Sequence, residues 1–308
     1  MRILLVGASG FVGGRLSDYL FKRNFKIINV SRKNKKNFFK INWNSKKNIN
    51  SLCTNIDVVI NCSGLDIYGS TNKKESYLVN SENPLKLLRA ADLNKVKFFL
   101  HLSTYSIYKR TKQNLINEKS ITIGKDLHSQ SKIKGENNLI NYPKIKTKLI
   151  IIRSCNLFGY PKYKSQNCWN LLINYLIKNL VNKRTVNILA NKNSYKTYSS
   201  LESFCEFFYS LLRYLSKGKN FPKVINYTSN KIYSITEIVR LLKKKLINKK
   251  IISKKLINKK INFANKIMKK DKRIKFKSLY QKSIKPINDL FFDKEINNLI
   301  NYCKKIKL

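Results

Sequence analysis

Three glycines near the start of the chain constrain its fold more than any other feature. An apolar run over residues 3–6 is followed by Gly7, Gly10 and Gly13, and then by apolar residues at helical spacing. This order predicts a strand, a tight turn and a helix. Glycines let a backbone approach a pyrophosphate, and the helix N-terminus supplies free N–H groups there. The spacing departs from G-x-G-x-x-G, so a generic strand-to-helix turn is the alternative. The matching context on both sides favours a dinucleotide site.

Apolar strand patterns and helical patterns then alternate up to about residue 160. The predicted strands are residues 3–6, 26–30, 58–61, 98–102 and 148–152, and the predicted helices are residues 13–22, 84–93 and 130–141. Pro84 suits the first turn of its helix, with Ser81 or Asn83 as the cap. Alternation of this kind predicts an α/β fold with a doubly wound parallel sheet, whose ligands lie at the carboxyl ends of the strands.

The pattern changes after Gly159. Helices are predicted over residues 170–182, 202–215 and 293–305, and a strand over 224–227. A helix over 234–245 opens with Ser234 and Glu237 at capping-box spacing. Residues 243–275 are dominated by Lys, Ile, Asn and Leu, and the heptapeptide KKLINKK occurs at 244–250 and again at 254–260. Two copies cannot build a solenoid, so this segment is either a basic helical face or a variable surface.

The net charge of +48 and the six cysteines limit which class of protein this chain can be. The lysines are spread over the whole chain, and Lys, Asn and Ile share codons made largely of A and T, so mutational bias explains the charge better than a specific nucleic-acid partner. No C-x-x-C pair occurs, so we expect no metal and reduced cysteines in the core. No signal peptide and no membrane-spanning segment is recognisable. We therefore expect a cytoplasmic protein that is not inserted in a membrane.

Several segments together resemble the extended short-chain dehydrogenase/reductase family, the NAD-dependent epimerase/dehydratases of nucleotide sugars. The glycine turn, residues 57–64 (DVVINCSG), Asn80, and residues 102–108 (LSTYSIY) are similar to its cofactor-side motifs. Ser131, Lys132 and Glu136 are similar to its S-K-x-x-x-E helix, and residues 152–159 (IRSCNLFG) to its R-P-x-N segment. Residues 224–229 and 234–238 look like the strand and helix that close its substrate domain. The resemblance covers most of residues 1–240.

The resemblance implies a Rossmann domain over residues 1–160 and a smaller C-terminal α/β substrate domain over 161–308, with parts of 195–230 returning to the first domain. It implies hydride transfer between a nucleotide sugar and the nicotinamide of NAD(P), and a setting in polysaccharide biosynthesis. The cofactor-binding residues that it implies are Gly7, Ser9, Gly10, Phe11, Val12, Gly13, Cys62, Ser63, Gly64, Asn80 and Lys132. In the family, a Tyr in Y-x-x-x-K is the base and a Ser or Thr bonds the substrate oxygen, which gives catalytic roles to Lys132 and Thr104.

The chain departs from the family at the tyrosine of Y-x-x-x-K, where it has His128. Imidazole has an ordinary pKa near 6.5 and can accept a proton at neutral pH, whereas a phenol near 10 needs help. The shorter ring is less suited to reach the same oxygen. Two alternatives therefore stay open: His128 is a replacement base, or the chain is a catalytically lapsed dinucleotide-binding protein of the same fold.

Cofactor and substrate preferences rest on single residues. Arg32 follows the second strand, where an acid would bind the ribose of NAD, so NADP is slightly favoured. By resemblance, Asn156 contacts the nucleotide diphosphate, and Lys196 takes the place of a phosphate-binding arginine unless it is simply a solvated lysine. Asn42 stands where the family often has Asp beside the adenine. Pairing of two copies into a homodimer would use helices that here include residues 84–93 and 130–141.

Overall fold

Seven parallel strands form the main sheet of the computed structural model, which describes residues 1–109, 115–263, 273–284 and 290–306. The strand order across the sheet is β11-β7-β5-β4-β1-β2-β3, and every neighbouring pair is parallel. The strands are β1 (Arg2–Val6), β2 (Lys26–Ser31), β3 (Phe39–Lys40), β4 (Val58–Asn61), β5 (Phe98–Thr104), β7 (Lys148–Ser154) and β11 (Val224–Tyr227). The order reverses between β1 and β4, which confirms the doubly wound Rossmann architecture and leaves a crevice at that point.

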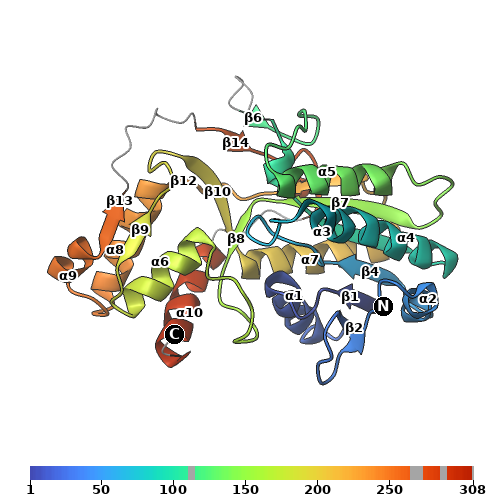
Figure 1. Ribbon diagram of the computed structural model, residues 1–308, viewed down its shortest axis with the longest axis horizontal. Coiled ribbons are helices and arrows are strands. Elements are labelled where there is room, and N and C mark those ends of the chain that lie inside the picture. Colours follow the sequence, from blue (N-terminus) through green and yellow to red (C-terminus); the bar gives the residue numbers. More distant parts are fainter. Residues whose placement is uncertain (110–114, 264–272, 285–289, 307–308) are drawn as a thin grey trace.

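Helices cover both faces of this sheet (Figure 1). Ile3 and Leu5 of β1 face α1 (Phe11–Phe21) and α7 (Leu201–Ser216), in a core with Leu16 and Phe204. The alternate residues of β1, Leu4 and Val6, belong to the core of the opposite face. The helices of that face are α2 (Lys46–Cys53), α4 (Asn83–Leu93) and α5 (Leu127–Ile140). All five strands and all three helices predicted for residues 1–160 exist, with ends shifted by up to three residues.

The helix that contains Pro84 begins earlier than the sequence predicts. Asn72 caps α3 (Lys73–Tyr77) by accepting from the Glu75 N–H, and a π-helical turn, η1 (Leu78–Glu82), leads directly into α4. Asn83 is already helical, so the expected cap at Ser81 or Asn83 is wrong. Proline has no N–H for the carbonyl four residues before it, so a wide turn at this point costs no additional hydrogen bond.

Gly135 of α5 lies directly against this wide turn. A Cβ at Gly135 would come within 2.2 Å of the Asn80 carbonyl oxygen. The contact brings α5 close to the helix that carries Asn80. The glycine is therefore required by packing, because the contacting atom is backbone and cannot rotate away.

Replacement of Gly135 by alanine is expected to destabilise the protein by about 1–3 kcal/mol, the usual cost of overpacking a core contact. Two helices would have to separate to admit the methyl group. Urea unfolding followed by circular dichroism measures the change. Asn137→Ala, on the exposed side of the same helix, is the control and is expected to change stability by less than about 0.5 kcal/mol. Equal stabilities of the two variants would contradict the close approach.

The C-terminal part of the chain builds a second group of elements around its own core (Figure 1). Its three-stranded sheet has β10 (Tyr195–Ser200) between β8 (Asn156–Phe158), which is parallel to it, and β12 (Ile232–Ser234), which is antiparallel. Two further strands, β9 (Val186–Ile188) and β13 (Ile261–Phe263), form a parallel pair. The helices are α6 (Leu172–Val181), α8 (Ile235–Asn248), α9 (Lys254–Lys259) and α10 (Leu290–Ile306). The remaining short elements are η2 (Tyr105–Ile107), η3 (Gln281–Ser283) and the strand pair β6 (Leu115–Ile116) and β14 (Lys275–Phe276).

The four helices and the strand predicted after Gly159 all exist. Ser234 and Glu237 form the capping box of α8, and the predicted strand at 224–227 is β11. The second KKLINKK copy lies in α9 and the residue after it, while residues 264–272 of the lysine-rich segment lie outside the described residues. All six cysteines are free thiols, five of them buried, as expected. None of the helices within the described ranges is long and apolar enough to cross a membrane.

A buried ion pair connects α1 with α10. The Arg15 Nη1 atom lies 2.9 Å from the Glu295 Oε1 atom, and the two side chains are 7% and 0% exposed. Arg15 also donates to the Tyr160 carbonyl. This pair joins the helix of the glycine turn to the last helix of the chain.

Candidate active site

The glycine turn has room only for hydrogen at two of its positions. Gly7 has φ +85°, and a Cβ there would lie 2.7 Å from the Ser63 nitrogen. A Cβ at Gly13 would lie 2.3 Å from the Gly7 carbonyl oxygen. Gly10 donates to the same carbonyl at 2.9 Å. The turn is therefore closed on itself, and the next elements approach it at backbone distance.

Helix α1 begins at the end of this turn without a side-chain cap. Gly10 is the N-cap residue, and no acidic residue occupies the first turn. The first N–H groups of a helix have no partner within the helix, and they carry the positive end of its dipole. Phe11 and Val12 are half-buried and Gly13 is buried. The arrangement fits an anion such as a pyrophosphate.

A cavity of about 130 Å³ lies beside the turn, at the carboxyl ends of β1, β2 and β4. It brings together seven of the residues singled out in the sequence: Gly7, Ser9, Gly10, Arg32, Cys62, Ser63 and Gly64. The Ser9 and Ser31 hydroxyls lie 3.1 Å apart across its wall. Asn42 is exposed and accepts from the Asn44 N–H, so it does not line this cavity. Ile41, Trp43 and Asn83, which the sequence reasoning did not assign to it, do.

Lys132 lies next to the same cavity with its ammonium group buried. The residue is 7% exposed, and its Nζ atom lies 3.4 Å from the Leu102 carbonyl oxygen. A Cβ at Gly64 would lie 2.7 Å from Nζ and 3.0 Å from the Asn80 Oδ1 atom. Burial lowers the pKa of Lys132 to about 8, against the opposing effect of the Glu136 carboxylate. The Lys132 ammonium therefore has only a long hydrogen bond to the protein, which fits a site that a ligand's hydroxyl or phosphate oxygens complete.

His128 lies in the first turn of α5, because this helix begins three residues earlier than the sequence predicts. Asp126 and Ser129 form its capping box. Burial, followed by the positive charge of Lys132, lowers the pKa of His128 to about 4. Its Nδ1 atom is buried and has no hydrogen-bond partner among the described residues. The imidazole is therefore neutral at physiological pH.

The remaining predicted substrate residues lie on three strands: Thr104 is the last residue of β5, Asn156 the first of β8, and Lys196 the second of β10. Thr104 caps η2 by accepting from the Ser106 N–H at 3.2 Å. Asn156 donates to the Tyr105 hydroxyl and to the Thr197 carbonyl, both at 2.9 Å. Lys196 lies beside Thr197 on β10 and is half-buried. Thr104 thus ends a strand of the main sheet, while Asn156 and Lys196 lie on paired strands of the second sheet.

Residues 3–227 match the model of the NAD dependent epimerase/dehydratase family. The chain belongs to this family. GDP-6-deoxy-D-talose 4-dehydrogenase of Aggregatibacter actinomycetemcomitans is 27% identical over 247 residues, which are 79% of each protein. GDP-L-colitose synthase of Yersinia pseudotuberculosis is 24% identical over 80% of this chain and 82% of its own. The extended short-chain dehydrogenase/reductase resemblance is thereby confirmed, and the family is NAD-dependent.

Solved structures of nucleotide-sugar epimerases share the whole fold. UDP-glucose 4-epimerase of Thermotoga maritima, solved with UDP-glucose, superposes with a TM-score of 0.82 at 16% identity over 100% of both chains. UDP-glucuronic acid 4-epimerase of Bacillus cereus, solved with NAD, gives 0.79 at 18% identity and covers 99% of this chain and 97% of its own. The Rossmann fold predicted from the sequence is therefore that of the family.

A buried network of polar side chains connects α5 to β5, β7 and β11. Glu136 accepts from Ser103 at 2.5 Å and pairs with Arg153 at 2.6 Å. Arg153 also donates to the Tyr108 hydroxyl, which donates to Asn226 at 2.7 Å. Burial alone would lower the pKa of Arg153, but the Glu136 carboxylate outweighs burial and raises it. These residues fix α5, and so Lys132, against the sheet.

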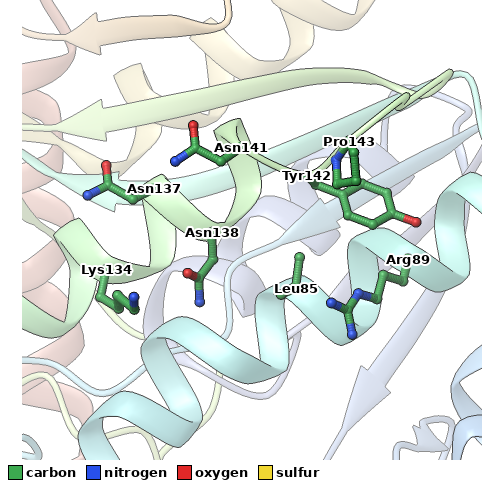
Figure 2. A pocket seen from close by; sticks show the side chains of 8 residues that line it. All are labelled: Leu85, Arg89, Lys134, Asn137, Asn138, Asn141, Tyr142 and Pro143. Atoms are coloured by element: carbon green, nitrogen blue, oxygen red, sulfur yellow. The ribbon is translucent and has the colours of Figure 1, made fainter.

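A hollow lies on the outer side of α4 and α5 (Figure 2). Its volume is about 360 Å³. Its lining is mostly polar and comprises Leu85, Arg89, Lys134, Asn137, Asn138, Asn141, Tyr142 and Pro143. None of these belongs to the glycine turn or to the strand ends, so the hollow is separate from the candidate active site. Pairing of two copies through these helices stays a prediction.

In the described ranges, no group of three His, Cys, Asp or Glu side chains is placed to hold a metal ion. His101 is fully buried, as a core histidine should be, and its Nδ1 atom lies 3.2 Å from the Asn61 amide nitrogen. Its Nε2 atom has no partner among these residues, which the sequence did not indicate.

Proposed function

We propose that this chain binds NAD(P) at the glycine turn and acts on a nucleotide sugar by hydride transfer, as an epimerase or reductase. The observation that carries the proposal is the buried Lys132 ammonium at Gly64, beside a glycine turn without room for side chains. Family membership and the GDP-sugar names of both curated relatives support the substrate class. Arg32, exposed at the rim, supports a slight preference for NADP.

The nicotinamide, when bound, supplies the hydride acceptor and donor. The side chains supply position and proton transfer. Lys132 would hold ribose hydroxyls through its ammonium, and Asn80 would fix the loop after β4, since its Oδ1 atom accepts from the Leu65 N–H at 2.8 Å. Thr104 would bond the reacting sugar hydroxyl, and His128 would take its proton while the carbon gives up hydride. Asn156 and Lys196 would contact the diphosphate of the substrate.

One observation favours the second candidate, a dinucleotide-binding protein that has lost catalysis. A pKa of about 4 makes the His128 imidazole a weak base. The Lys132 charge that would activate a phenol works against imidazole, because like charges disfavour the protonated ring. The two candidates share the fold and the cofactor site and differ only in turnover.

Replacement of His128 by tyrosine separates them. We expect NADH and NADPH affinities to stay within about twofold of wild type under both candidates. If the enzyme has lapsed, turnover of GDP- or UDP-sugars should rise by roughly 10²-fold, the typical contribution of a positioned acid–base group. The phenol reaches further, and the neighbouring ammonium lowers its pKa. Fluorescence titration measures binding, and nicotinamide absorbance measures turnover with a panel of nucleotide sugars.

The matched control is Gln130→Tyr, which adds a tyrosine on the exposed side of the same turn and should change nothing. An active wild type that loses turnover in the His128→Tyr variant would identify the imidazole as the working base. Turnover by the variant alone would identify a lapsed enzyme. Absence of dinucleotide binding in both proteins would overturn the proposed cofactor site.

A further inference from the structure

One segment from the C-terminal side of the chain crosses the glycine turn. After β8 and before α6, residues 160–170 run beside α1, and we call this segment the strap (Figure 1). Lys162 pairs with Asp18 of α1, and the Tyr160 carbonyl accepts from Arg15 at 2.9 Å. Lys35 lies in the loop after β2, and its ammonium is 3.3 Å from the centroid of the Tyr163 ring. The strap thus contacts two of the segments that border the cofactor cavity, the glycine turn with its helix and the loop after β2.

Gln166 makes the central contact of the strap. Its Nε2 atom donates to the Ser9 carbonyl at 3.0 Å and to the Gly10 carbonyl at 2.7 Å. Its own position is fixed, because its Oε1 atom accepts from the Tyr163 N–H and its N–H donates to the Tyr163 carbonyl. The side chain is buried, with 4% exposure. Both N–H groups of one amide are therefore committed to the nucleotide turn.

The orientation of these two carbonyls matters for an anion. In a peptide unit the C=O and the following N–H point in opposite directions, so holding the Gly10 carbonyl fixes the direction of the Phe11 N–H, the first of α1. A carbonyl turned toward the cavity would repel a phosphate, whereas a carbonyl held by Gln166 leaves that side to N–H groups.

Gly14 of α1 lies directly against the Gln166 side chain. A Cβ at Gly14 would lie 2.5 Å from the Gln166 Nε2 atom and 3.3 Å from the Tyr163 ring. Gly14 follows the three glycines of the turn but does not line the cavity. Its lack of a side chain makes room for Gln166.

We propose that Gln166 is a positioning residue of the dinucleotide site, which holds the glycine turn from behind so that its N–H groups face the pyrophosphate. The inference rests on the proposed cofactor binding. It also makes the strap a direct link between the substrate side of the molecule and the cofactor turn. Gln166 itself touches backbone only and does no chemistry.

The test compares Gln166→Ala and Gln166→Glu with Asn167→Ala, an exposed position on the same strap. We expect NADH affinity to fall about tenfold in the alanine variant, equivalent to 1.4 kcal/mol. The glutamate variant should fall further, because its carboxylate cannot donate and repels both carbonyls. Hydrogen–deuterium exchange of the amides of residues 10–14 should speed up in the free variants, while the thermal midpoint of Gln166→Ala stays within two or so degrees of wild type. Asn167→Ala should match wild type throughout.

A double variant guards against a purely structural explanation. Gly14→Ala alone should weaken NADH binding, because the methyl group displaces Gln166. In the Gln166→Ala background the same methyl group has room, so the second change should cost little NADH affinity.

Equal NADH affinity in wild type and both Gln166 variants would overturn the inference and leave the cofactor site intact, as would affinity losses that only track lost thermal stability. Failure of wild type to bind NADH or NADPH would instead overturn the proposed function.

Discussion

Replacement of Lys132 by methionine is expected to stabilise the free protein and to remove most of its dinucleotide affinity. Lys132 is 7% exposed, and its ammonium donates to a carbonyl at 3.4 Å, a long hydrogen bond. Its pKa falls from 10.5 to about 8 on burial, which corresponds to a penalty of about 3 kcal/mol at neutral pH. Methionine fills the space without that penalty, so the thermal midpoint should rise by several degrees. NADH affinity, measured by fluorescence, should fall at least tenfold.

The stabilisation should depend on pH in a defined direction. The folded pKa of Lys132 lies below the unfolded one, so the unfolded state binds more protons between about pH 8 and 10.5. Wild type therefore gains stability as pH rises through this window. The gap between Lys132→Met and wild type should be full at pH 7 and nearly closed at pH 10.

Lys134→Met is the matched control, because Lys134 is exposed two residues further along the same helix. It should alter neither the midpoint nor NADH affinity. A Lys132→Met variant less stable than wild type, with unchanged NADH affinity, would show that the buried ammonium is structural and not held for a ligand.

Glu136→Gln is expected to cost about 3–5 kcal/mol of folding free energy, the usual result of removing one partner from a buried ion pair. The amide would leave the Arg153 guanidinium buried without a counter-charge. Side-chain exposures of 9% for Arg153 and 3% for Glu136 leave water little access to compensate. Denaturant unfolding with a constant slope measures the loss.

Asp293→Asn provides the comparison at the surface. Asp293 pairs with Lys245 at 2.7 Å, but its side chain is 66% exposed. Surface pairs contribute about 0–1 kcal/mol, so this variant should unfold within that range of wild type. Similar losses in the two variants would refute the special role given to the buried network.

Local sequence patterns were sufficient for most of the fold. The apolar runs that became β1, β4 and β7 are short and buried on both faces, as a parallel sheet requires. The capping pair Ser234 and Glu237 located the start of α8 to the residue. Only the cap of the helix around Pro84 was predicted wrongly, because proline is accepted both in a first turn and after a π-helical turn that continues an earlier helix.

The candidate site, like the fold, was predicted only where its residues are close together in the sequence. The glycine turn is contiguous in sequence, so its spacing predicted where the cavity would form. The contact of Gln166 with Ser9 spans 157 residues, and the bond between Tyr108 and Asn226 spans 118. No periodicity or spacing marks such pairs, since each partner is an ordinary polar residue in its own segment. Burial of Lys132 likewise depends on Leu102 and Gly64, which approach it only in the fold.

The ion pair between Arg15 and Glu295 has a consequence for how the chain is made. The two residues are 280 positions apart, so a ribosome that adds residues one by one delivers the carboxylate long after the guanidinium. Until then water solvates the guanidinium, because the helix that covers it has not yet been made. The contact between α1 and α10 is therefore among the last that the chain can form, and the helix of the glycine turn gains this support only after Glu295 has been synthesised.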